Sequence, residues 1–238
     1  MTQLRFARAE FSAWVGIVGN LALAVLKGTA GVLSGSQALI ADAVNSASDV
    51  AGSLAVLIGF RAAKRPPDRD HPYGHGKAES ISAIVVSVLV LLAGFEVARG
   101  AVAALFFSDG PLPAPEPFAV WVLVAAIAAK EFLYRYTYYQ GKRLRSQALI
   151  ATAMDHRSDV FASGAALIGV GGALIGSAYG IGWLSYADPF AGLVVSLLVM
   201  RMGYKIIKES IHNTMDHVMH AEDAEALIRC VQRVKGVI

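Results

Sequence analysis

The chain contains 238 residues, of which 55% are hydrophobic and 16% are charged. Soluble domains have about 25% charged and 45–50% apolar residues, so this composition excludes an ordinary soluble globule. The single cysteine, Cys230, excludes a disulfide within the chain and a site built from several thiolates. The formal net charge of +3 comes from basic residues spread over short polar stretches, which favours no nucleic-acid partner.

Long apolar runs predict an all-α membrane protein with six transmembrane helices in the lipid bilayer. A helix needs about 20 predominantly apolar residues to cross a bilayer. Runs of this length cover residues 11–33, 37–60, 80–106, 118–140, 148–175 and 187–209. No small-residue cleavage pattern follows the first run, so we expect the amino terminus to be retained.

Basic residues flank only one side of these predicted spans. They are Arg5, Arg8, Arg61, Lys64, Arg65, Arg69, Lys77, Lys142, Arg143, Arg145, Lys205 and Lys208. The opposite loops, around residues 34–36, 107–117 and 177–186, contain no Lys or Arg. Because cytoplasmic loops carry an excess of Lys and Arg, we expect both chain ends to be cytoplasmic. The predicted location is the plasma (inner) membrane.

The predicted transport domain covers residues 1–210, and residues 211–238 form a polar linker and the start of a second domain. Within 221–234, Ala224, Leu227 and Val231 recur at helical spacing. This amphipathic helix has nothing further along the chain to pack against. We therefore expect a truncated cytoplasmic C-terminal domain.

The second and fifth predicted spans carry the densest polar residues at membrane depth. Asp42, Asn45 and Asp49 are three, four and seven positions apart, so they share one helix face. Asp155 and Asp159 are one turn apart on the fifth span. An ionisable residue inside a span costs at least about 2.5–3.5 kcal/mol, so these residues indicate a functional site.

These acids have no Lys or Arg at helical spacing on their own helix faces. Clustered carboxylates repel one another in a low dielectric unless a cation or protons compensate, which favours a divalent-cation site. The alternative is structural: the acids cap helix ends or pair with Lys27, Lys130 or Arg157.

The loop between the second and third spans contains a second candidate metal site. Asp68, His71 and His75 all carry side chains that bind metals. Taken alone, histidines in an exposed loop are more often solvated or hydrogen-bonded than bound to a metal.

Four ordered motifs resemble the cation diffusion facilitator family. They are the segment from Ser34 to Asp49, the segment from His71 to Glu79, Asp155 with Asp159, and Asp188 followed by Pro189. The resemblance covers all six predicted spans and the start of the cytoplasmic domain. It implies a homodimeric transporter that exports a divalent metal in exchange for protons. It does not imply an enzyme.

The resemblance also implies a transport site made of two residues on each of two spans. These residues are Asn45 and Asp49 on the second span and Asp155 and Asp159 on the fifth, with Asp42 outside the site. Similar zinc transporters usually carry a histidine on the fifth span, where this sequence has Asp155. Oxygen ligands suit Mn²⁺ in six-coordinate sites, whereas imidazole suits tetrahedral Zn²⁺. We therefore expect Mn²⁺ as the transported metal, with Zn²⁺, Fe²⁺, Co²⁺ and Cd²⁺ as alternatives.

Other polar residues of the spans receive predictions of their own. His156 follows Asp155 directly, so it is turned by about 100° from the predicted ligand face, and we expect it to pack or support the site. We expect Asn20 and Glu96 to form interhelical hydrogen bonds. Lys27 has no predicted role beyond the structural alternative above.

The same resemblance implies that Asp68, His71 and His75 bind a second, cytoplasmic metal ion. It further implies a charge pair between Lys77 and Asp216 that holds two protomers together, with His212 as an alternative to Asp216.

Two other functions remain open. The first is an intramembrane hydrolase using an aspartate pair or a metal-activated water, although the sequence has no His-Glu-x-x-His element. The second is a metal-binding subunit that does not transport.

Overall fold

The computed structural model describes residues 2–63, 65–108, 112–144 and 146–215, and long α-helices dominate this part of the chain. They are α1 (Thr2–Ser34), α2 (Gln37–Ala63), α3 (Ala78–Phe106), α4 (Phe118–Leu144), α5 (Gln147–Tyr179) and α6 (Ala187–Thr214), with a short 3₁₀ helix η1 (Gly182–Tyr186) before α6. The predicted all-α fold with six helices is confirmed. Each helix extends beyond its predicted apolar run at one or both ends.

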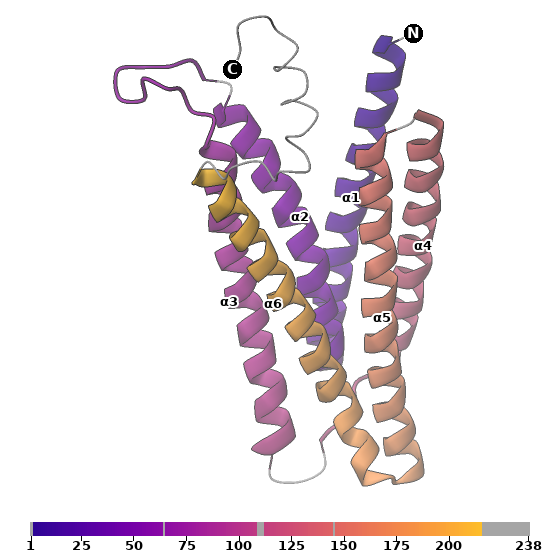
Figure 1. Ribbon diagram of the computed structural model, residues 1–238. Helices are drawn as coiled ribbons and strands as arrows, with labels where there is room; N and C mark the ends of the chain where they lie inside the picture. Colours follow the sequence, from indigo (N-terminus) through magenta and orange to yellow (C-terminus); the bar gives the residue numbers. More distant parts are fainter. Residues whose placement is uncertain (1, 64, 109–111, 145, 216–238) are drawn as a thin grey trace, which may run out of the picture.

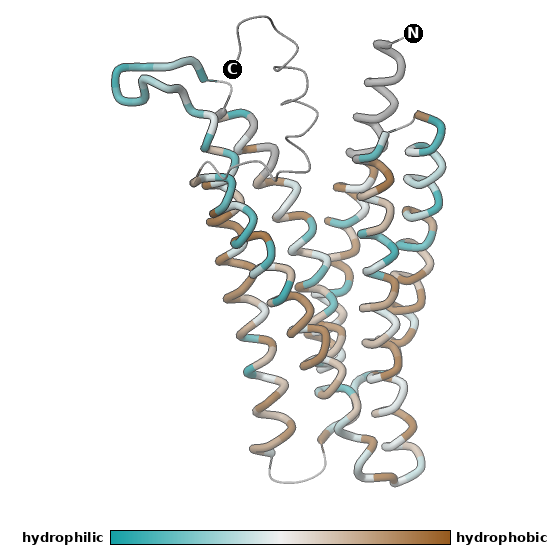
Figure 2. The backbone as a smooth tube through the Cα atoms, viewed as in Figure 1, coloured by the Kyte–Doolittle hydropathy of each residue, from teal (hydrophilic) through white to brown (hydrophobic). Residues whose placement is uncertain are grey.

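The bundle has the dimensions and surface of a membrane domain. Four described segments, Trp14–Ser34, Ala78–Phe106, Leu149–Tyr179 and Gly182–Thr214, are long and apolar enough to cross a membrane by length and composition. Helices α2 and α4 pack among them with 27 residues each, about 40 Å at 1.5 Å per residue. Apolar residues predominate along the middle of the helices, and hydrophilic residues gather at the upper loops (Figure 2).

The helices form two groups that separate toward one end of the bundle (Figure 1). Helices α2, α3 and α6 pack together, as do α1, α4 and α5. The start of α1 and the end of α6 lie at the end where the groups diverge. Buried apolar residues from both groups, among them Leu39, Leu123 and Val170, pack together toward the opposite end. The shared apolar core of the two groups therefore lies away from the end where they diverge.

The turn between α1 and α2 explains two of the sequence motifs. Gly35 has a φ of 69°, in the left-handed region that glycine adopts without steric cost. The hydroxyl of Ser36 donates to Asp188 Oδ1 of α6 at 2.6 Å, and the Gln37 backbone N–H donates to Asp188 Oδ2 at 2.8 Å. Asp188 thus satisfies free donors at the start of α2 and joins α6 to it.

Two sequence expectations have other outcomes. Glu96 pairs with Arg99 one turn later on α3, so the predicted interhelical hydrogen bond of Glu96 is wrong. Asp216 and the predicted amphipathic helix over 221–234 lie outside the described residues. The division into two domains therefore stays a prediction.

Candidate metal transport site

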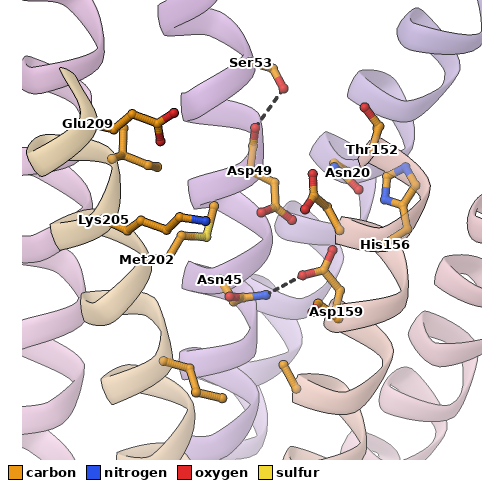
Figure 3. A pocket seen from close by; sticks show the side chains of 15 residues that line it. Asn20, Asn45, Asp49, Ser53, Thr152, His156, Asp159, Met202, Lys205 and Glu209 are labelled. Atoms are coloured by element: carbon orange, nitrogen blue, oxygen red, sulfur yellow. Dashed lines mark hydrogen bonds between the residues drawn. The ribbon is translucent and has the colours of Figure 1, made fainter. Parts of the chain in front are cut away.

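Helices α2 and α5 bring the predicted ligands together near the middle of the bundle. Asn45 and Asp49 are one turn apart on α2, and Asp159 lies on the facing side of α5 (Figure 3). The Asn45 side-chain amide donates to Asp159 Oδ1 at 2.9 Å. Residues more than 100 positions apart in the sequence therefore meet at one site.

A cavity of about 470 Å³ contains all four predicted transport-site residues in its lining. Helices α1, α2, α5 and α6 all contribute to its walls. Asn45 and Asp159 lie deep in the cavity, and Ser53, Thr152 and Glu209 lie nearer the diverging end of the helices (Figure 3). The cavity thus extends from the middle of the bundle toward the end that carries the basic loops.

The ligands differ in their access to this cavity. The side chains of Asp49 and Asp159 are 15% and 9% exposed, and Asn45 is buried. Asp155 is exposed and lies one turn closer to the diverging end on α5. An ion entering from that end would meet Asp155 before the two deeper carboxylates.

A lysine from α4 pairs with the two deep carboxylates. Lys130 Nζ lies 2.5 Å from Asp159 Oδ2 and 3.3 Å from Asp49 Oδ2, and its side chain has no exposed surface. It also donates to Asn20 Oδ1 on α1 at 2.9 Å, which confirms the interhelical hydrogen bond expected for Asn20. Although the acids' own helix faces carry no Lys or Arg, Lys130 therefore supplies a compensating charge from another helix.

Asp42 also pairs with a lysine, and it does not line the cavity. Lys27 Nζ of α1 lies 2.7 Å from Asp42 Oδ2, and both side chains are fully buried. Ser163 of α5 donates to the same carboxylate at 2.8 Å and accepts from Lys27 at 2.9 Å. The structural alternative named Lys27 and Lys130 as partners of the acids, and both pairings are observed.

His156 lines the same cavity as Asp155 and Asp159. Its ring is buried, and neither ring nitrogen has a hydrogen-bond partner among the described residues. The 100° turn from Asp155 therefore does not carry His156 away from the site. The cavity covers a broad arc of α5, from Thr152 to Ala162.

The loop residues Asp68, His71 and His75 lie together, with one possible ligand atom from each within 4.8 Å of the others. Asp68 Oδ1 accepts from the backbone N–H of His71 at 2.7 Å, and this hydrogen bond lowers the pKa of the Asp68 carboxyl. His75 Nε2 lies 3.5 Å from Asp68 Oδ2. The three side chains are close enough together to form a candidate metal site.

Comparison with known proteins identifies the family. Residues 13–213 match the model described as the cation efflux transmembrane domain. The chain belongs to this family. The resemblance seen in the four sequence motifs is thereby confirmed, and the chain is an integral membrane metal efflux transporter.

Similar proteins match the cation efflux transporter over most of its length. The manganese efflux system protein MneP of Bacillus subtilis is 38% identical over 228 residues, which cover 94% of this chain and 76% of MneP. MneS of the same organism is 33% identical over 230 residues, covering 97% of this chain and 76% of MneS. Metal tolerance protein C1 of Arabidopsis thaliana is 36% identical over 238 residues, covering 94% of this chain and 49% of that protein.

Two residues that contact the predicted ligands or line their cavity are not among the ligands that the sequence predicts. The sequence gives Lys130 only as a structural partner of the acids and places Asn20 outside the site, although Asn20 lines the cavity. Both lie inside spans, where a buried polar residue is a functional hypothesis by default. That signal is present in the sequence, but only the packing of α1 and α4 against α2 and α5 connects these residues to the four predicted ligands. We call these ligands the quartet: Asn45, Asp49, Asp155 and Asp159.

Proposed function

We propose that this cation efflux transporter exports Mn²⁺ from the cytoplasm in exchange for protons and has no enzymatic activity. The observation that carries the proposal is the single cavity in which Asn45 and Asp49 of α2 meet Asp155 and Asp159 of α5. Facing helices that supply ligands to one buried ion are typical of transporters, in which movement of the helices changes access to the site.

The donor atoms support manganese as the substrate. The quartet offers three carboxylates and one amide, and hard divalent ions prefer such oxygen ligands. Two similar proteins, MneP and MneS, are named as manganese efflux proteins. Zn²⁺, Fe²⁺, Co²⁺ and Cd²⁺ are the competing substrates, because raw affinity favours Zn²⁺ over Mn²⁺ at most sites.

The shape of the bundle supports alternating access. The cavity extends toward the basic-loop end, which we propose faces the cytoplasm, with the plasma membrane around the bundle. Beyond Asn45 and Asp159, the Lys27–Asp42 pair and the apolar residues around Leu39 close the opposite route. Mn²⁺ would enter the cavity, the two helix groups would rock, and protons arriving from the outer side would replace the metal on the carboxylates.

The loop site and the dimer complete the proposal. We propose that Asp68, His71 and His75 bind a second metal ion on the cytoplasmic side. Lys77 and Asp216 would hold two protomers together, as the family resemblance implies, with residues 211–238 beginning the cytoplasmic domain. Cross-linking of cysteines placed at positions 77 and 216 in membranes tests this dimer.

Metal-stimulated proton flux in proteoliposomes tests the function. Vesicles with the native chain are compared with vesicles carrying Asp159→Ala, with Mn²⁺ and Zn²⁺ in parallel. We expect Mn²⁺ to drive proton flux in the native chain and the variant to show only background flux. Mn²⁺ binding without flux in the native chain would favour a non-transporting subunit, and undiminished flux in the variant would contradict the site.

A further inference from the structure

A fully buried ammonium group, that of Lys130, contacts two carboxylates of the cavity wall. None of the described residues of α4 lines the cavity, yet Lys130 extends from α4 to two of its carboxylates. Its three N–H donors have three acceptors, on Asp49, Asp159 and Asn20. A fully buried lysine is tolerated only with such compensation, so its charge depends on the carboxylates proposed to hold the metal.

Both oxygens of Asp159 already accept a hydrogen bond in this arrangement. Oδ1 accepts the Asn45 amide at 2.9 Å, and Oδ2 accepts Lys130 at 2.5 Å. A metal ion on this carboxylate must replace a donor or share an oxygen with it, and the ammonium repels a cation that shares its oxygen. The metal must also face the Asn45 oxygen rather than its nitrogen. The lysine and the metal therefore compete for the same oxygen atoms.

We propose that Lys130 is a built-in counter-cation that occupies Asp49 and Asp159 when the site holds no metal and leaves them when the metal binds. The inference rests on the proposed function, since it needs these aspartates to be metal ligands. Asn20, which also lines the cavity, gives the displaced ammonium an acceptor outside the quartet. Return of the ammonium to the carboxylates would then help to expel the metal.

This competition lowers the apparent metal affinity. If the ammonium occupies the carboxylates in about nine molecules out of ten, only the remaining tenth is ready to bind, and the apparent Kd is raised about tenfold. A purely structural lysine would have a different effect: its removal would disorder the site and weaken metal binding.

Mn²⁺ titration of the detergent-purified 238-residue chain separates these roles. Lys130→Gln keeps hydrogen-bond donors and removes the charge, and Lys130→Met removes both. We expect Kd for Mn²⁺ to fall about tenfold in each variant. In proteoliposomes both KM and maximal rate should fall, because metal is captured more tightly and released more slowly. Lys130→Arg, which keeps the charge, should lower Kd less than Lys130→Gln does.

Two controls make the outcome decisive. Lys142→Met makes the same chemical change at an exposed position of α4 and should leave Kd unchanged. Asp159→Asn should remove Mn²⁺ binding. Unchanged or weaker Mn²⁺ binding in folded Lys130→Gln, with binding still dependent on Asp159, would overturn the role of Lys130 alone. Binding that does not depend on Asp159 would overturn the proposed site, and the role of Lys130 with it.

Discussion

Two fully buried lysines each neutralise aspartates between α2 and α5, but their surroundings differ. Lys27 pairs with Asp42 at 2.7 Å, and neither side chain has exposed surface. Lys130 pairs with Asp49 and Asp159, which both line the cavity. One helical turn separates Asp42 from Asn45 on α2. The same pairing is thus enclosed at one level of the bundle and adjoins the cavity at the next, where we propose that it exchanges with the metal.

The largest expected effect is a difference in Mn²⁺ transport and binding between variants of the two aspartates of α2, Asp49 and Asp42. Asp49→Asn keeps the size of the side chain and removes a carboxylate from the cavity, so Mn²⁺-dependent flux in proteoliposomes should fall to background. Asp42→Asn lies outside the cavity, and its folded fraction should still bind Mn²⁺ with the native Kd. Loss of Mn²⁺ binding in both variants would show that Asp42 belongs to the site.

The Lys27–Asp42 pair should matter chiefly for stability. Asp42→Asn leaves a buried ammonium without its carboxylate, which costs about 3–5 kcal/mol in free energy of unfolding. Replacing both partners with apolar residues, Lys27→Met with Asp42→Leu, should recover most of this loss, since apolar substitutes for buried ion pairs are often neutral. Thermal unfolding in detergent measures both variants. An Asp42→Asn protein as stable as the native chain would contradict the structural role.

Metal selectivity should respond to Asp155. Asp155→His places an imidazole among the cavity ligands and should raise the ratio of Zn²⁺ to Mn²⁺ flux by about tenfold, because imidazole suits tetrahedral zinc. Asp155→Asn is the matched control, since it keeps an oxygen donor and adds no imidazole. An equal change in selectivity in both variants would mean that charge, rather than ligand type, determines the preference.

A smaller effect is expected at the closed end. Ser36→Ala removes the hydrogen bond to Asp188 and the helix cap that Ser36 Oγ makes with the Leu39 N–H, costing about 1–2 kcal/mol in free energy of unfolding. Ser82→Ala is the control, because the Ser82 hydroxyl donates to a carbonyl within its own helix, α3. Equal unfolding temperatures for the two variants would argue against a joining role for Asp188.

The smallest effect concerns the exposed loop. The His71 backbone N–H lowers the pKa of Asp68 below its ordinary value of 3.8. The pKa of Asp68 is lower in the folded chain than in the unfolded chain. The hydrogen bond therefore contributes to folding stability above pH 3.8, and this contribution is lost as the pH falls through the folded-state pKa. Amide chemical shifts of His71, followed by NMR during acid titration, report this loss. Asp68→Asn should abolish the titration, and a persistent one would assign it to another group.

Spacing within single helices predicts which candidate ligands share a helix face, and the family resemblance, not spacing, separates the quartet from Asp42. Residues three or four apart share a helix face, so Asn45 with Asp49 and Asp155 with Asp159 are visible in the sequence. The lysine pairs could not be predicted in this way. Lys130 lies 81 positions from Asp49, and only the packing of α1 and α4 against α2 and α5 determines which carboxylate each lysine meets.

The lining of the cavity shows a second limit of helical periodicity. Spacing gives the direction of a side chain around its own helix, but it does not give the width of the space that the helix faces. The cavity spans a broad arc of α5, so His156 lines it together with Asp155. Glu96 shows the converse, since its partner Arg99 lies on the same helix and not on a neighbour.

Anomalous diffraction from crystals of the native chain soaked in Mn²⁺ tests the central claim most directly. We predict a manganese peak in the cavity between α2 and α5, within bonding distance of carboxylate oxygens of Asp49 and Asp159, with the Lys130 ammonium moved off at least one of them. A peak confined to Asp68, His71 and His75, with Lys130 still on both aspartates at saturating Mn²⁺, would contradict the account.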